Sequence, residues 1–142
     1  MGKTIKTILI FLIALLGYSE WLTGTSYLQR PIVLGPLVGL VMGDVVTGTI
    51  MGATMELAMV GAISVGAYNP PDTISGTILG VSLAMQAGAD ASAALTLGIP
   101  IATIVLALDT ALGQPVMLLL VHRIDKNVED GDTKAITRNM LI

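Results

Sequence analysis

The chain has 142 residues, of which 54% are hydrophobic and only 12% are charged, and its mean hydropathy is +0.84. Soluble domains carry about 25% charged residues, so this composition excludes an ordinary soluble globule, and it excludes a disordered chain as well. A net charge of −3 with seven Lys and Arg residues excludes a nucleic-acid-binding protein. The composition favours an all-α, polytopic helical membrane protein.

The side chains needed for common metal and thiol chemistry are missing from the sequence. The chain has no cysteine, so it offers no disulfide, no thiolate nucleophile and no cysteine metal ligand. His122 is the single histidine and begins a polar segment. We therefore expect no catalytic residue, no metal site and no cofactor.

The charges are distributed unevenly along the chain. From Pro31 to Val121 there are 91 residues without a Lys or Arg. A helix needs about 20 apolar residues to cross a bilayer, so this stretch is long enough for about four crossings. Basic residues flank it on both sides, which favours both ends on the cytoplasmic side. Five acids lie inside it: Asp44, Glu56, Asp72, Asp90 and Asp109.

Taken in chain order, apolar segments predict helices over residues 5–22, 31–48, 49–68 and 73–88. The sequence Asn69-Pro70-Pro71-Asp72 separates the third from the fourth, because proline donates no backbone hydrogen bond and disfavours helical geometry in the residue before it.

The last apolar stretch, residues 91–121, is too long for one simple crossing. As a helix it would measure about 46 Å, against a hydrocarbon core of about 30 Å. Pro100 and Pro115 lie within it. We therefore expect one crossing plus a shorter re-entrant or interfacial piece. Residues 1–121 would form the transmembrane domain, and residues 122–142 a polar loop or tail.

Glycines recur at helical spacing in the centre of the chain. Gly35, Gly39 and Gly43 lie four residues apart. After one step of five residues, Gly48, Gly52 and Glu56 again lie four residues apart. Such rows bring helix backbones close together, so we assign these glycines to helix packing. The block 48–52 recurs as 76–80, 28 residues later. An internal repeat of the kind that transporters contain is one explanation; similar composition is the favoured one.

Two of the acids are candidates for a functional site. Asp44 and Glu56 lie inside apolar runs, where a carboxylate costs about 2.5–3.5 kcal/mol and usually faces a polar cavity or a partner. We favour a functional role over structural pairing for both. Asp72 and Asp90 adjoin Pro or Gly turn signals and are interpreted as turn residues, whereas Asp109 is undecided.

The segment from Gly39 to Glu56 resembles the signature of the sugar-transporting IIC subunits of the mannose–fructose–sorbose family of bacterial phosphotransferase systems. It shares the spacing of several glycines, of Asp44 and of the terminal Glu56. Gln29-Arg30-Pro31 and the segment 67–72 are also similar to that family, and the N-acetylgalactosamine branch is the most similar. Family subunits are longer, so this chain corresponds to their N-terminal half.

The resemblance implies a permease in the bacterial cytoplasmic (inner) membrane rather than an enzyme. Such subunits form an oligomeric complex with a IID membrane partner and present a hexose or amino sugar to cytoplasmic IIA and IIB phosphocarrier proteins. They hold no phosphoacceptor of their own. Carboxylates and amides bind sugar hydroxyls strongly where water is excluded. We expect Glu56, Asp44 and Asn69 to bind the substrate.

Other functions remain open at this point. The chain is alternatively a truncated, transport-inactive subunit that packs against the IID partner. An intramembrane aspartyl protease with Asp44 and Asp109 is disfavoured, because such enzymes use a Gly-x-Gly-Asp pattern and this chain has Val41 in place of the first glycine. A proton-translocating ring subunit is also disfavoured, because such hairpins carry one carboxylate.

Overall fold

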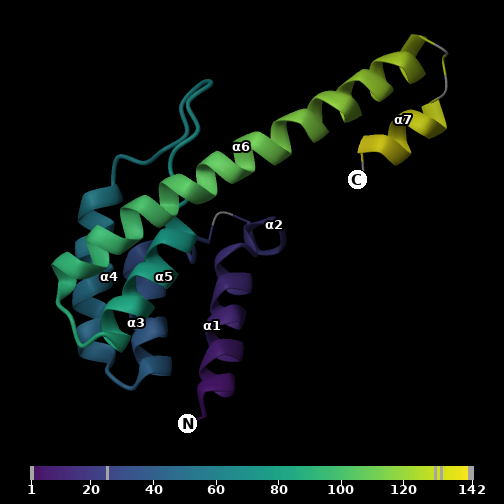
Figure 1. The fold of residues 1–142 in the computed structure, drawn as a ribbon. Coiled ribbons are helices and arrows are strands. Elements are labelled where there is room, and N and C mark those ends of the chain that lie inside the picture. The colour runs from purple at the N-terminus through teal and green to yellow at the C-terminus, as the bar shows by residue number, and fades with distance from the viewer. Residues whose placement is uncertain (1, 25, 130, 132, 141–142) are drawn as a thin grey trace. The chain divides into compact units, whose positions relative to one another are not determined.

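A computed structural model describes residues 2–24, 26–129, 131 and 133–140, and all regular secondary structure in these residues is helical (Figure 1). This confirms the all-α fold class. The helices are α1 (Lys3–Gly17), α2 (Glu20–Thr23), α3 (Pro31–Met42), α4 (Val45–Met59), α5 (Thr73–Gln86), α6 (Ala91–Glu129) and α7 (Thr133–Met140).

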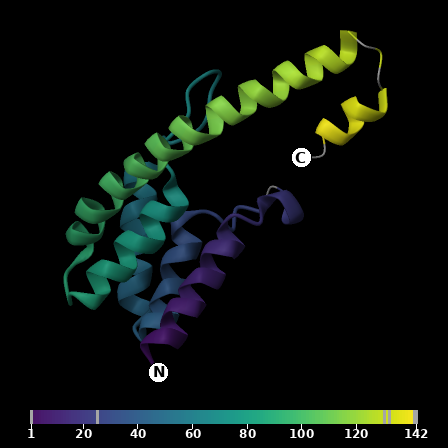
Figure 2. The same cartoon turned by 45° about the vertical axis from the view of Figure 1, so that its right-hand side comes forward.

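The chain divides into two units, Met1–Leu106 and Ala107–Ile142. In the first unit, α3, α4 and α5 pack together with α1 and the beginning of α6. The N-terminus, the α3–α4 turn and the α5–α6 turn lie at one end of this unit, and the long α4–α5 loop lies at the other (Figures 1 and 2). The second unit consists of the rest of α6 and α7.

The first two predicted helices end earlier than expected. The helix predicted over 5–22 breaks after Gly17, and the short α2 follows from Glu20. The helix predicted over 31–48 ends at Met42. Gly43 follows it with a φ of 98°, a left-handed conformation that glycine adopts without a steric penalty, and Asp44 then begins α4. The boundary at 48/49 was therefore wrong, whereas the helix predicted over 73–88 is confirmed as α5.

The prediction of two pieces within residues 91–121 was also wrong. One helix of 39 residues, α6, runs through Pro100 and Pro115 and includes His122. Proline inside a helix removes one backbone hydrogen bond and crowds the turn before it, yet α6 is continuous at both positions. Within the described residues α6 is the one helix long and apolar enough to cross a membrane, while α3, α4 and α5 are shorter apolar helices. Residues expected to form a polar loop or tail continue α6 and form α7.

Glycines bring the helix backbones into direct contact, which confirms the assignment to packing for Gly35, Gly39, Gly48 and Gly52; it was wrong for Gly43, which ends α3 and has no atom within 4 Å of an added methyl group. A methyl group added to Gly35 would lie 2.5 Å from Cα of Gly52, and one added to Gly48 would lie 2.5 Å from Cα of Gly39. The α5–α6 pair repeats this arrangement, because a methyl group on Gly80 would lie 2.8 Å from Cα of Gly98. The fully buried core lies beside these contacts and includes Leu34, Val38, Met51, Met55 and Val81.

Candidate functional site

Asp44 lies in the turn between α3 and α4 and forms the N-cap of α4. Its Oδ1 accepts a hydrogen bond of 3.0 Å from the backbone N–H of Thr47, and its Oδ2 accepts one from the Thr47 hydroxyl. The hydroxyl bond and then the backbone bond hold the pKa of the Asp44 carboxyl below its ordinary value. The Asp44 side chain is exposed at the turn.

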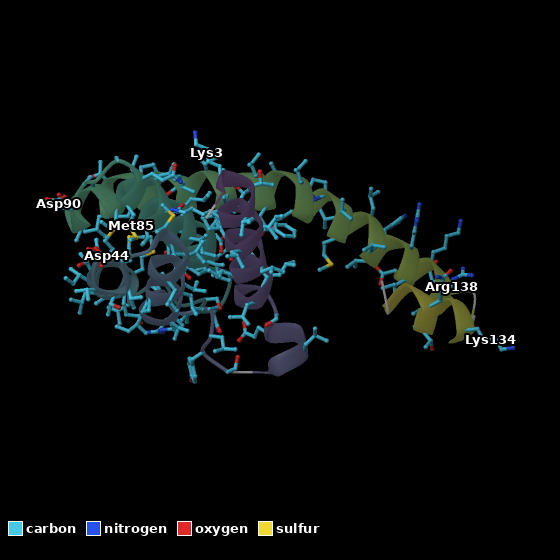
Figure 3. All side chains as sticks on the ribbon, turned by 90° about the horizontal axis from the view of Figure 1, so that it is seen from below. Lys3, Asp44, Met85, Asp90, Lys134 and Arg138 are labelled. Atoms are coloured by element: carbon cyan, nitrogen blue, oxygen red, sulfur yellow. The ribbon has the colours of Figure 1, made fainter. Side chains whose placement is uncertain are left out.

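A pocket of about 320 Å³ opens beside this carboxylate. It is formed where the N-terminal end of α4 meets the C-terminal end of α5, and Figure 3 shows Asp44 and Met85 close together at this end. Its lining combines one carboxylate and one hydroxyl with two methionines and a small-residue turn: Met42, Asp44, Thr47, Met85, Gly88 and Ala89. Lys6 of α1 adds a positive charge nearby, because its Nζ lies 3.5 Å from the carbonyl oxygen of Met42.

Glu56 lies near the opposite end of α4. Its Oε1 forms an ion pair with the Arg30 guanidinium, and its Oε2 accepts a hydrogen bond of 3.3 Å from the backbone N–H of Ile32. The Glu56 side chain is 15% exposed and that of Arg30 is 36% exposed. Glu56 thus neutralises the one nearby cation and satisfies an N–H group in the first turn of α3.

The three predicted substrate ligands do not form one cluster. Asp44 precedes Glu56 by twelve residues, and at 1.5 Å per residue they lie about 18 Å apart along α4. Asn69 is exposed in the loop that joins α4 to α5, at the end of the unit away from the pocket. The structure therefore brings Asp44 to a pocket and Glu56 to a cation, and it leaves Asn69 on the surface.

Asp72 and Asp90 act as helix-capping turn residues, as their neighbours in the sequence predicted. Asp72 accepts a hydrogen bond of 3.2 Å from the backbone N–H of Ser75 at the start of α5, and Asp90 accepts one of 3.1 Å from that of Ala93 in α6. Asp109 is exposed on α6. In the part of the chain that the structure describes, acids and histidines do not gather into a group able to hold a metal ion.

Comparison with protein families identifies the chain. The family described as "PTS system sorbose-specific IIC component" matches residues 4–142. The chain belongs to this family. It is thus a member of a family of phosphotransferase-system IIC components, and a membrane protein.

Individual relatives place this IIC chain among sugar permease components. It is 32% identical over 134 residues to N-acetylgalactosamine permease IIC component 1 of Escherichia coli (strain K12). The aligned region covers 89% of this chain and 47% of the relative. It is 28% identical to the mannose-specific EIIC component of the same strain, over 94% of the chain and 50% of the relative. A further relative from that strain is 38% identical over 94 residues, or 66% of the chain and 71% of the relative.

A solved structure shares the fold. The cryo-EM structure of the mannose transporter ManYZ in complex with microcin E492 superposes with a TM-score of 0.75 and 28% identity, covering 99% of this chain and 56% of that one. The IIC chain thus spans about half the length of this transporter chain and of the two named permease components.

Five of the six residues that line the pocket were not predicted from the sequence, among them Met42 in the last turn of α3. Thr47 was detectable, because an acid followed three residues later by a hydroxyl is typical of a helix start. Met85, Gly88 and Ala89 were not detectable from the sequence, since only tertiary packing brings the end of α5 to Asp44. Together with the Asp44 carboxylate, these residues give the pocket a charged acceptor, a hydroxyl and an apolar wall. This combination suits small polar molecules that also have apolar faces.

Proposed function

We propose that this chain carries a hexose or amino sugar across the bacterial cytoplasmic membrane as the IIC subunit of a phosphotransferase system. The observation that supports the proposal most strongly is the family match over residues 4–142. The names of the relatives suggest N-acetylgalactosamine and mannose as the first substrates to test. A IID membrane subunit and cytoplasmic IIA and IIB proteins complete the system, with α3–α5 and α6 embedded as a multi-pass bundle.

Within this function, Asp44 is the proposed substrate ligand. An ionised carboxylate accepts hydrogen bonds from adjacent sugar hydroxyls, and the pocket beside Asp44 has the volume to admit a monosaccharide. The methionine side chains that line it offer apolar surface to the C–H face of a sugar ring. Glu56 and Asn69 stay predicted ligands, and the ion pair with Arg30 gives Glu56 a structural role as well.

Sugar uptake by whole cells tests this function. The chain is expressed with and without IID, IIA and IIB in cells that lack their own system, and uptake of tritiated N-acetylgalactosamine, mannose, fructose and sorbose is measured. We expect uptake of one of these sugars that depends on the three partners. We expect Asp44→Asn to reduce this uptake at least about tenfold, because a hydrogen bond to a charged group is weakened.

Asp90→Asn is the matched control, because Asp90 also caps a helix at this end of the unit and accepts a hydrogen bond from the Ser92 hydroxyl. This variant should transport normally. An equal loss in both variants would assign the effect to capping and contradict a ligand role for Asp44. Absence of uptake by the unmodified chain with every partner present would favour the transport-inactive subunit.

A further inference from the structure

The internal similarity around the glycine blocks is longer than five residues and has a structural counterpart. Residues 44–55, DVVTGTIMGATM, align with residues 72–83, DTISGTILGVSL, at the same offset of 28. Each copy begins with an aspartate that caps a helix and accepts a hydrogen bond from the backbone N–H three residues later. The paired glycines of each copy then contact a neighbouring helix, α3 or α6. Similar composition alone, the explanation favoured from the sequence, does not account for these equivalent positions.

The two copies run in opposite directions. Asp44, at the beginning of α4, lines the same pocket as Met85, near the end of α5. Asp72, at the beginning of α5, therefore lies at the other end of the bundle, as Figure 2 shows for the two helix starts. Antiparallel copies of this kind are typical of transporters whose binding sites lie at the interface between repeats.

In the second copy, Asp72 and Ser75 bind the hydroxyl group of Tyr18. The Tyr18 phenol donates a hydrogen bond to Oδ2 of Asp72, and its oxygen lies 2.8 Å from Oγ of Ser75. Because the phenol proton is committed to the carboxylate, the Ser75 hydroxyl is the donor in the second contact. Asp72 and Ser75 thus form a clamp that binds one hydroxyl as both donor and acceptor.

In the first copy the equivalent pair, Asp44 and Thr47, faces the pocket of about 320 Å³. The Thr47 hydroxyl donates to Asp44, whereas the equivalent Ser75 hydroxyl of the second copy contacts the Tyr18 oxygen. We infer that Asp44 and Thr47 form an open copy of the clamp, which binds one hydroxyl of a polyol ligand as Asp72 and Ser75 bind Tyr18. On binding, the Thr47 hydroxyl gives up its hydrogen bond to Asp44 and donates to the ligand hydroxyl, which in turn donates to Asp44. This inference rests on the proposed function and deepens it by assigning the contact to one hydroxyl.

Equilibrium binding to membranes that contain the full chain and its partner proteins tests the clamp. The probe is tritiated N-acetylgalactosamine or mannose, whichever is taken up, and unlabelled deoxy analogues that each lack one hydroxyl compete with it. We expect Thr47→Val to weaken binding about tenfold and Thr47→Ser to restore it. One deoxy analogue should bind weakly to the unmodified chain and lose no further affinity in Thr47→Val, because the contact is already absent.

The matched control is Thr54→Val, because the Thr54 hydroxyl donates only to the backbone oxygen of Ile50 within α4. It should bind like the unmodified chain. If Thr47→Val does not assemble, Thr47→Ala and the deoxy series on the unmodified chain provide the same comparison. Unchanged affinity in the Thr47 variant, with sugar uptake intact, would overturn the clamp and leave the proposed function standing. Absence of binding and of uptake in the unmodified chain would overturn both.

Discussion

Gly52→Val is expected to destabilise the helix bundle strongly. A side chain at position 52 would place its Cβ 2.6 Å from the carbonyl oxygen of Pro31 and 2.8 Å from Cα of Gly35. Both are backbone atoms, so α3 and α4 must separate along their whole contact. We expect a loss of about 3 kcal/mol of stability, the upper part of the range for overpacked cores. This corresponds to a fall in Tm of about 10 °C, measured by circular dichroism of the detergent-solubilised protein.

Gly61→Val is the control for this substitution. Gly61 follows α4, and a Cβ at this position would have no atom within 4 Å. Its Tm should stay within a few degrees of that of the unmodified chain. A Gly52→Val protein with unchanged Tm would show that the α3–α4 contact in the membrane differs from the one described.

The ion pair between Arg30 and Glu56 should give the second large effect. Removing one partner leaves the other charge partly buried and unpaired, and Glu56→Gln also replaces the charged acceptor of the Ile32 N–H by a neutral one. Since Arg30 is 36% exposed, solvent screening reduces the cost below that of a fully buried pair. We expect Glu56→Gln and Arg30→Gln each to cost about 2 kcal/mol in the same unfolding experiment.

The double variant Arg30→Gln/Glu56→Gln separates the structural role of Glu56 from substrate binding. An ion pair predicts that the double variant is little less stable than either single variant, because the charges are removed together. Additive losses would contradict the pairing. Sugar uptake by the double variant gives the second readout: normal uptake would contradict Glu56 as a sugar ligand, whereas its loss in a stable protein would support that role.

Local signals predicted much of the fold. The packing of Gly35, Gly39, Gly48 and Gly52, the turn at Asp72 and the limits of α5 depend on residues close together in sequence, and all three were predicted. The end of α3 was missed although Gly43-Asp44 carries a helix stop followed by a start, because the apolar run continues through it. The continuity of α6 through Pro115 was missed because proline weakens a helix locally, while the rest of a long helix maintains it.

The candidate site depends on contacts that the sequence does not display. Asp44 was selected because a carboxylate in an apolar run is costly, and it lies at a pocket. The same argument selected Glu56, but Arg30 stands 26 residues earlier in the sequence and became its partner only through the packing of α3 on α4. The apolar wall near Met85 likewise requires the antiparallel arrangement of α4 and α5.

The most direct test of the central claim, that sugar binds in the pocket beside Asp44, is protection of a single cysteine from labelling. The chain has no cysteine, so Ala89→Cys places one thiol on the pocket wall and Ser64→Cys places one on the exposed α4–α5 loop. The rate of maleimide labelling is measured in membranes with and without the transported sugar. We expect the sugar to slow labelling at position 89 several-fold and to leave the rate at position 64 unchanged. Equal rates at position 89 with and without saturating sugar would contradict it.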